Sequence, residues 1–223
     1  MPPLDAYLSP QSQQAVIAGM FLSFGWLVVA AQTRRRDARL RREREADIQR
    51  ALLAEIRAHV VSLEQQTPSH SDAAMLIARI RSGDFVPTLS QQANDRIFAA
   101  VIGELHILPA PVIDPIVLYY RLLSIMEALA TDLRRIARRD GERAAQMMGD
   151  YLSLMAETRD CGIHAIRVLT ECLRGGPDAV EAMLDADEAE AVAQLNRHLP
   201  DELAQMRARL EAVSTRSSDP RGR

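Results

Sequence analysis

Residues 48–63 read IQRALLAEIRAHVVSL, with apolar side chains at every third or fourth position. This spacing predicts an amphipathic helix, whose apolar face needs a partner along its whole length. No proline occurs from position 11 to position 67. Because an interior proline would remove a hydrogen bond and clash with the preceding turn, this stretch allows one rod that ends near Gln66. Its expected core side chains are Ile48, Leu52, Leu53, Ile56, Val60 and Leu63.

A second proline-free stretch, 116–176, predicts two long helices. The first has Asp114 as its N-cap and Pro115 at its first helical position, where a missing N–H costs nothing. The second begins after Gly141 and stops at Gly175-Gly176-Pro177. The expected apolar stripes are Tyr119, Leu122, Leu123, Met126, Leu129, Leu133 and Ile136 in the first helix, and Met148, Tyr151, Met155, Gly162, Ile166, Leu169 and Leu173 in the second.

Capping signals predict the shorter helices, because a short oxygen side chain satisfies the free N–H groups of a helix start. Ser69 with Asp72 opens a predicted helix over 69–81, which Gly83 and Pro87 close. Thr88 with Gln91 opens another over 88–108, bounded by Pro109-Ala110-Pro111. Two short helices opened by Asp178 with Glu181 and by Asp185 with Glu188 follow, and a last helix covers 200–213.

The chain has 223 residues, of which 48% are apolar and 26% are charged, enough for one domain with a modest core. No segment alternates apolar and polar residues between turn residues, so no strand is expected. The expected fold class is all-α: an N-terminal transmembrane helix, with or without continuation as a long cytosolic helix, followed by a helical bundle. The expected division is a short extracytoplasmic N-terminus (1–14), the transmembrane helix (15–32), a juxtamembrane amphipathic helix (33–66), a cytosolic bundle (67–213) and a disordered tail (214–223).

Residues 15–31, AVIAGMFLSFGWLVVAA, form 17 consecutive residues without charge or proline. About 17 residues is the lower limit for a helix that spans a bilayer. A cleaved signal peptide would carry positive charge before the apolar run, but residues 1–14 hold only Asp5 and the terminal amine. A buried core helix, the other alternative, fits poorly with an apolar surface that runs all the way round.

Arginines follow the apolar run directly, at Arg34, Arg35, Arg36 and Arg39. Between positions 34 and 50 there are eight arginines and four acids, a net charge of +4. The positive-inside rule then keeps the C-terminal part in the cytoplasm and sends the N-terminus out. We therefore expect a single-pass protein of the bacterial inner (cytoplasmic) membrane, with the lipid bilayer as the partner of these flanking arginines.

The composition excludes several kinds of chemistry. All 27 basic residues are arginine, which excludes a Schiff-base lysine and the phosphate-binding lysines of P-loop proteins and protein kinases. Cys161 and Cys172 lie on one expected helix, too far apart along its axis for a disulfide. Cys161, His164 and Glu157 fall one turn apart but make no complete zinc set, so we expect a buried thiol beside a surface imidazole. No catalytic residue, cofactor or metal site is expected.

Two arginine clusters suit phosphate groups, but a simpler explanation exists for each. For the arginines of residues 34–44, contact with lipid headgroups is a sufficient explanation. The other cluster, which lies within residues 134–143, is explained by a solvated helix end, because cations near the C-terminus of a helix offset its dipole. With a formal net charge of −3, nucleic acid is not expected as a partner. Residues 178–190 hold six acids and no base, and we expect them to face one of the clusters. The second cluster comprises Arg134, Arg135, Arg138, Arg139 and Arg143.

Several short patterns carry a resemblance to other proteins. They are Leu-Leu-x-Glu-Ile at 52–56, then Phe85-Val86-Pro87, Phe98, Leu108-Pro109 and the segment 112–120 with Tyr119-Tyr120. Together they resemble a loosely defined group of uncharacterised bacterial single-pass membrane proteins, over about residues 15–135 of this chain. The resemblance implies an N-terminal membrane helix followed by a helical cytoplasmic domain, and it implies no activity.

The leading expectation for function is a membrane-anchored helical interaction or scaffold module with a protein partner. One alternative is a membrane-bound small-molecule sensor or enzyme with a pocket in the bundle, and another is a protein that contacts nucleic acid. Homodimerisation is a further expectation, because Ala15, Gly19 and Ser23 recur every four residues and small side chains let membrane helices approach closely. In a continuous helix, the seam of Ile48, Leu52, Ile56 and Val60 would extend such a parallel dimer.

Overall fold

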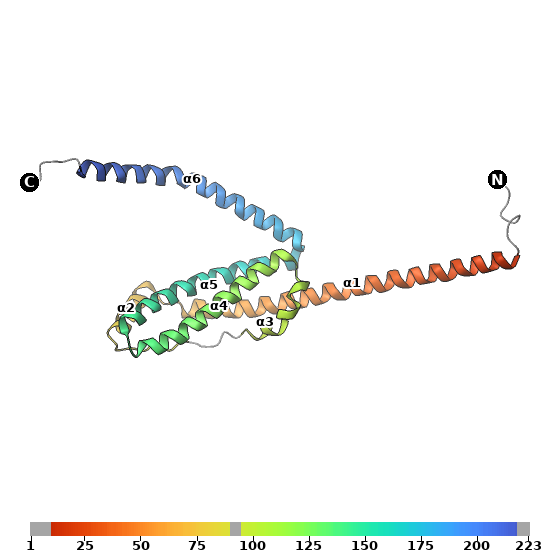
Figure 1. Cartoon of the computed structure of the whole chain (residues 1–223), viewed down its shortest axis with the longest axis horizontal. Coiled ribbons are helices and arrows are strands. Elements are labelled where there is room, and N and C mark those ends of the chain that lie inside the picture. Colours follow the sequence, from red (N-terminus) through yellow and green to blue (C-terminus); the bar gives the residue numbers. More distant parts are fainter. Residues whose placement is uncertain (1–9, 90–94, 218–223) are drawn as a thin grey trace, which may run out of the picture.

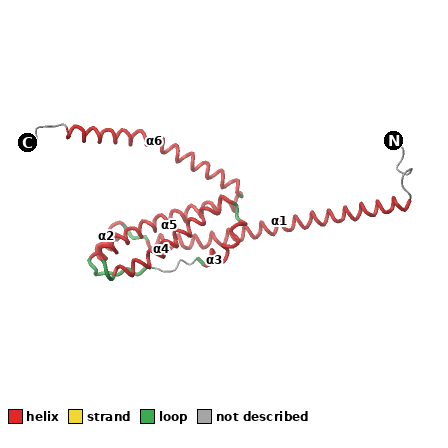
Figure 2. Tube along the Cα trace, in the orientation of Figure 1, coloured by secondary structure: helices red, strands yellow, loops and turns green. Residues whose placement is uncertain are grey.

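The chain is built from helices of very different lengths (Figures 1 and 2). The computed structural model describes the backbone of residues 10–89 and 95–217, and the side chains of Gln14, 19–89 and 95–197. Every regular element in these ranges is helical, which confirms the all-α class. In chain order the elements are α1 (Pro10–Gln66), α2 (His70–Arg81), α3 (Arg96–Val101), the 3₁₀ helix η2 (Ile102–Ile107), α4 (Ala110–Ala137), α5 (Gly141–Gly175) and α6 (Pro177–Ser217).

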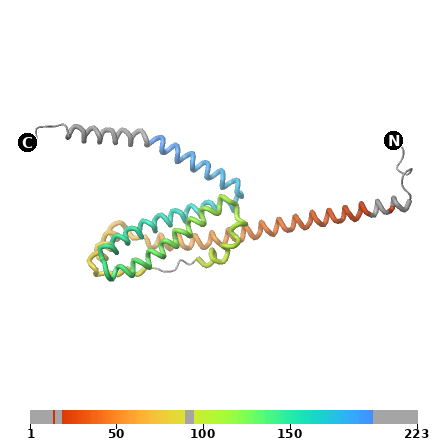
Figure 3. The backbone as a smooth tube through the Cα atoms, viewed as in Figure 1, coloured from red at the N-terminus to blue at the C-terminus, as the bar shows by residue number. Residues whose placement is uncertain are grey.

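Helix α1 is one rod of 57 residues, and it ends at Gln66 as the proline spacing predicts. Only its C-terminal half belongs to the bundle, because its buried residues run from Ile48 to Leu63. Residues 19–44 of α1 extend away from the other helices (Figure 3). The bundle therefore begins near Ile48, well before the predicted boundary at residue 67.

Within the part of the chain whose side chains are described, no helix combines the length and the apolarity needed to cross a bilayer. Residues 15–18, the first four of the predicted span, lie outside that part.

Helix α5 is the centre of the bundle, since α1, α2, α4 and α6 all pack against it. Gly162 on α5 lies directly against two of them, α1 and α4. A Cβ atom at this position would lie 2.5 Å from Val60 Cγ2 on α1 and 2.8 Å from Tyr119 Cε2 on α4. The missing side chain is thus what lets three helices meet at one level of the core.

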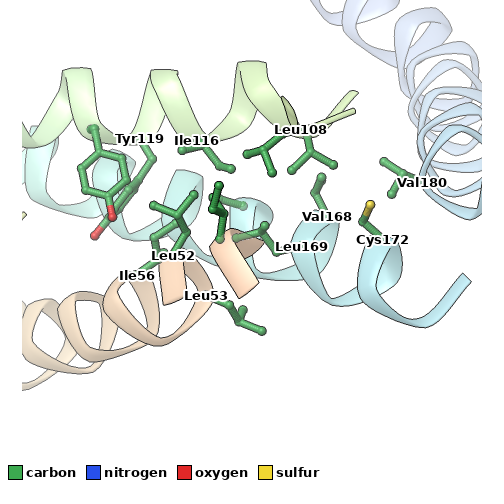
Figure 4. Packing of buried hydrophobic residues seen from close by; sticks show 14 of the residues in the cluster. Leu52, Leu53, Ile56, Leu108, Ile116, Tyr119, Val168, Leu169, Cys172 and Val180 are labelled. Atoms are coloured by element: carbon green, nitrogen blue, oxygen red, sulfur yellow. The ribbon is translucent and has the colours of Figure 1, made fainter. Parts of the chain in front are cut away.

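The core consists of two apolar clusters. The first lies between α1, α4 and α5 and is closed by Leu108 and Val180 (Figure 4). The second surrounds Ile80 of α2 at the other end of α4 and α5. All six apolar side chains predicted on α1 are buried. Most of the predicted stripes on α4 and α5 are buried as well, and four members are only partly buried: Leu129, Ile136, Ile166 and Leu173.

Two predicted helix starts are confirmed in atomic detail. The Ser69 hydroxyl accepts a hydrogen bond from the Asp72 N–H at 3.2 Å and so caps α2. Helix α5 begins at Gly141, next to its predicted start, and its N-cap is Asp140, which was not among the predicted caps and accepts from the Arg143 N–H at 3.0 Å. Helix α5 ends where predicted, because Gly176 adopts a φ of +77°, which other residues avoid.

The prediction of a helix from Thr88 to Leu108 is wrong at its start. Thr88 lies in an irregular segment, Gln91 lies outside the described residues, and α3 begins only at Arg96. The reason is tertiary, because the first N–H groups of α3 are bound by a carboxylate of α1, as described below.

The predicted start of α4 is also wrong. The helix begins five residues before Pro115, at Ala110, with Pro109 as its N-cap and Pro115 inside it. This earlier start brings Val112 and Ile116 onto one face, and both are fully buried. Pro111 in the first turn costs little, since its N–H would be unpaired there in any case.

The C-terminal predictions need a similar correction. Instead of three short helices, α6 is one helix of 41 residues that contains both Asp185 and Pro200. Its alanine-rich, acidic first half favours helix and contains no breaker. The helix reaches Ser217, past the predicted start of the tail at 214, and residues 218–223 lie outside the described ranges.

Candidate functional site

The first candidate surface is the arm, which we define as residues 19–44 of α1. Its large apolar side chains are exposed, with Trp26 at 81% and Leu22 at 76%. Met20, Phe21 and Leu22 are consecutive, and so are the residues from Trp26 to Val29, so the exposed apolar surface surrounds the helix. Nothing in the described bundle packs against this surface (Figure 1).

Four predicted membrane-flanking residues, Arg34, Arg35, Arg36 and Arg39, lie on the arm between this apolar surface and the bundle, and all are exposed. Arg39 pairs along the helix with Glu43 at 2.8 Å. Both side chains are well exposed, so this pair contributes little to stability. The charges therefore remain accessible to an external anionic surface.

The predicted small-residue seam lies on the arm only in part. The side chain of Ala15 is outside the described residues, and a Cβ on Gly19 would have no neighbour within 4 Å. The Ser23 hydroxyl donates to the Gly19 carbonyl oxygen at 2.8 Å. The expectation that this seam continues along the bundle half of α1 is wrong, because those side chains are buried in the core. They are Ile48, Leu52, Ile56 and Val60.

The second candidate surface centres on Glu55, a carboxylate that is only 7% exposed. It accepts hydrogen bonds from the N–H groups of Ile97 at 2.7 Å and Phe98 at 3.0 Å, both in the first turn of α3. It also accepts from the Tyr120 hydroxyl of α4 at 2.6 Å. One side chain of α1 therefore joins two other elements. Burying a carboxylate is costly unless such donors satisfy it.

Aromatic rings pack around this carboxylate. The Phe98 and Tyr120 rings stack with centroids 3.9 Å apart and planes at 10°. Tyr119 meets Tyr120 edge to face at 5.2 Å. Burial raises the pKa of Tyr120, and its hydrogen bond to Glu55 raises it further. Burial raises the pKa of Tyr119 as well, and the Glu55 charge raises it further. Both phenols are therefore protonated at neutral pH.

An ion pair holds the other end of the same segment. Arg44 on α1 donates to both oxygens of Glu104 in η2, from Nε at 2.8 Å and from Nη2 at 2.7 Å. The hydrogen bond from Arg44 lowers the pKa of the Glu104 carboxyl. Residues 96–107 are thus attached to α1 at both ends.

The sequence patterns that carry the resemblance include Tyr120, Phe98 and Glu55, but they assign no role to Glu55. A signal was present, since Glu55 lies between Leu53 and Ile56 and three positions after Leu52, at the border of the apolar face. A charged side chain at that border needs donors from another element. The sequence alone does not say which element provides them.

The cysteines and the basic cluster show no convergent site. Cys161 is half-buried and Cys172 is buried, both as free thiols, and burial raises the pKa of each. His164, expected on the surface, is half-buried. Among the described residues, no three side chains of the metal-binding types come together. In the second arginine cluster, Arg134 is half-buried and the other four are exposed.

The acidic stretch 178–190 contacts neither arginine cluster through its described ion pair. Asp187 pairs instead with Arg167 of α5 at 3.1 Å. Two hollows of about 400 and 380 Å³ lie on the surface, one along α1 near Arg42 and one between α5 and α6 near Thr170. Both are open, so neither is a pocket enclosed by the bundle.

No protein-family model, no curated protein and no solved structure matches this chain.

Proposed function

We propose that this protein is a single-pass, membrane-anchored helical interaction module, held at the cytoplasmic face of a bacterial inner membrane with its N-terminus outside. The observation that carries the proposal is the arm, where exposed apolar side chains surround the helix and arginines follow. Each large apolar side chain moved from water into hydrocarbon gains about 1.5–3 kcal/mol. A bilayer is the solvent in which such a surface is stable.

The dimensions support the same arrangement. Residues 15–31 of the continuous helix α1 are about 26 Å long, against a hydrocarbon layer of about 30 Å. From Gln32 to Arg44 the helix is exposed on all sides, a stalk of about 20 Å. The stalk would keep the bundle clear of the lipid and leave its surface accessible to a protein partner.

The second long extension supports the interaction role. Helix α6 packs on the bundle through Val180, Met183 and Leu184 and pairs with α5 through Asp187, after which it extends away from the bundle (Figure 1). Beyond that point Val192 is 52% exposed and Leu195 is 60% exposed. An extended helix with exposed apolar residues is a common means of engaging a partner helix.

The test of the proposal is topology and membrane extraction of the full chain. Reporter fusions at residue 1 and at residue 223 should report an external N-terminus and a cytoplasmic C-terminus, and the protein should resist extraction by carbonate. Release by carbonate, or a C-terminal fusion active outside the cytoplasm, would contradict the proposal.

A charge variant with a matched control tests the role of the flanking arginines. Replacing Arg34, Arg35, Arg36 and Arg39 by alanine should raise the fraction of inverted molecules, because the orienting charge next to the span is removed. Replacing Arg134, Arg135, Arg138 and Arg139 removes the same charge far from the arm and should leave orientation unchanged. Equal effects of the two variants would show that the position of the arginines relative to the span does not determine orientation.

A further inference from the structure

The strap, which we define as residues 96–107, lies on the bundle without entering its core. Neither α3 nor η2 contains a buried residue, whereas α4 contains ten and α5 eleven. Four strap side chains pack on the first core cluster and remain partly exposed: Ile97, Phe98, Val101 and Leu105. The α1, α4 and α5 core would keep its own contacts if the strap moved away.

The strap depends on the bundle for its helical structure. With six residues, α3 is far shorter than a helix that is stable alone in water. Its own N-cap residue, Asp95, makes no side-chain capping hydrogen bond. Glu55 of α1 performs that task across the tertiary contact, at 2.7 and 3.0 Å.

The surface beneath the strap therefore has the features of a helix-binding site. Glu55 accepts hydrogen bonds from the free N–H groups at a helix start, and the Tyr120 ring stacks on an aromatic side chain of the same turn. Arg44 donates to a carboxylate one or two turns later in that helix. The strap presents its apolar side chains at positions i, i+1, i+4 and i+8, which is how an amphipathic helix fills such a surface.

We propose that the surface formed by Arg44, Glu55 and Tyr120 is a docking site for an amphipathic helix, and that the strap occupies it in cis. A partner helix of the same chemistry would displace the strap: an aromatic side chain in its first turn, two free N–H groups at its start and an acidic residue near its end. Glu55 makes the site specific for the N-terminus of a helix, because its carboxylate accepts hydrogen bonds from the free N–H groups there. This inference concerns the bundle and does not depend on the membrane location.

Hydrogen exchange on the full chain in detergent tests the first half of the inference. Strap amides should exchange at least about tenfold faster than the core amides of α4 and α5, since opening breaks fewer contacts than global unfolding. Glu55→Ala should accelerate strap exchange by a further factor of about ten or more, while the core amides of α5 remain slower than those of the strap. Glu64→Ala, an exposed site on the same helix, is the control.

If Glu55→Ala does not fold, strap exchange is measured in a second variant, Tyr120→Phe. This substitution removes one of the three hydrogen bonds that the Glu55 carboxylate accepts. Exchange of the strap and the core at one common rate in the parent protein would overturn the inference. Strap exchange that neither variant accelerates would overturn it as well.

Binding of a peptide in trans tests the docking site itself. The probe is a labelled peptide of residues 95–108, added to the full chain in detergent. It should bind the Phe98→Ala protein at least about tenfold more tightly than the parent, whose own strap competes. Adding Glu55→Ala to that protein should abolish the gain. A peptide carrying Phe98→Ala is the control probe. Failure to bind, or binding that ignores Glu55, would show that the surface recognises no helix in trans.

Discussion

At the scale of single residues, the two adjacent tyrosines of α4 have different roles. Tyr120 donates to Glu55 at 2.6 Å, whereas the Tyr119 hydroxyl is buried without a hydrogen-bond partner in the described part of the chain. Both rings are packed, so removal of the hydroxyl alone separates hydrogen bonding from packing. Neighbouring positions with the same side chain thus provide a natural pair of variants.

Tyr120→Phe should lower the free energy of unfolding by about 1–3 kcal/mol, because it removes a bond to a buried carboxylate. Tyr119→Phe should change it by less than about 0.5 kcal/mol or increase it slightly, since no bond is lost. Denaturant unfolding of the full chain in detergent, followed by circular dichroism, measures both. Equal losses would show that the hydrogen bond to Glu55 is not what distinguishes the two hydroxyls.

The tyrosines also predict an alkaline limit to stability. Burial raises the pKa of Tyr119, Tyr120 and Tyr151 above the ordinary value of 10.0. Below pH 10 both states are protonated and the full stability is present. Above pH 10 the unfolded chain loses these protons first, so stability falls as pH rises. Absorbance of the phenolate should appear together with unfolding, and Tyr120→Phe should show a shallower loss. Ionisation of these phenols in a folded chain would contradict the assignment.

Two glycines of α5 form another matched pair. A Cβ at Gly162 would collide with Val60 and Tyr119, whereas one at Gly149 would have no neighbour within 4 Å. Alanine favours helix over glycine by about 1 kcal/mol at both positions. Gly162→Ala should therefore be less stable than Gly149→Ala by about 1–3 kcal/mol, the cost of overpacking. A smaller difference in thermal unfolding would mean that α1 and α4 can move apart.

At the scale of elements, local signals predict what is locally determined. The ends of α2 and α5 are set by their own caps, Ser69 and Asp140, and by Gly176, so they were predictable. The apolar face of α1 was predictable because its period is that of a helix. The start of α3 was not, because Glu55 is 42 residues away in sequence from the N–H that it binds.

The start of α4 shows the same limit. Asp114 followed by Pro115 is a good local start signal, but burial of Val112 favours a helix that begins at Ala110. The Glu55 surface was missed for a related reason, since Arg44 and Glu55 lie on α1 and Tyr120 lies on α4, 65 residues after Glu55. Sequence periodicity identifies faces, and it does not identify which faces meet.

Aspartate variants test this correction of the elements. Asp140→Ala removes the cap of α5 and should cost about 0.5–2 kcal/mol. Asp114→Ala should change stability by no more than about 0.5 kcal/mol, since Asp114 is an exposed residue within α4 and caps nothing. Thermal unfolding of the two variants side by side gives the answer. A loss at Asp114 as large as that at Asp140 would restore the predicted start.

At the scale of the whole molecule, α1 belongs to two environments at once. Its first half is the proposed anchor, and its second half supplies one wall of the first core cluster. The bundle and the arm are therefore one rigid rod where they join, with no linker between Arg44 and Ile48. Movement of the arm in the membrane would be transmitted to the bundle directly.

This arrangement predicts which fragment folds. A fragment of residues 45–197 keeps all six buried apolar side chains of α1, whereas one of residues 68–197 loses them and exposes their partners on α5. Their burial contributes on the order of 10 kcal/mol, which is comparable to the whole stability of a typical domain. The longer fragment should unfold cooperatively on heating, as followed by circular dichroism, and the shorter one should show no cooperative transition. A control fragment of 45–197 with Leu123→Asp should also fail to fold, because it buries an unpaired carboxylate in the same core. Cooperative unfolding of residues 68–197 at the temperature of the longer fragment would show that α1 is only an anchor.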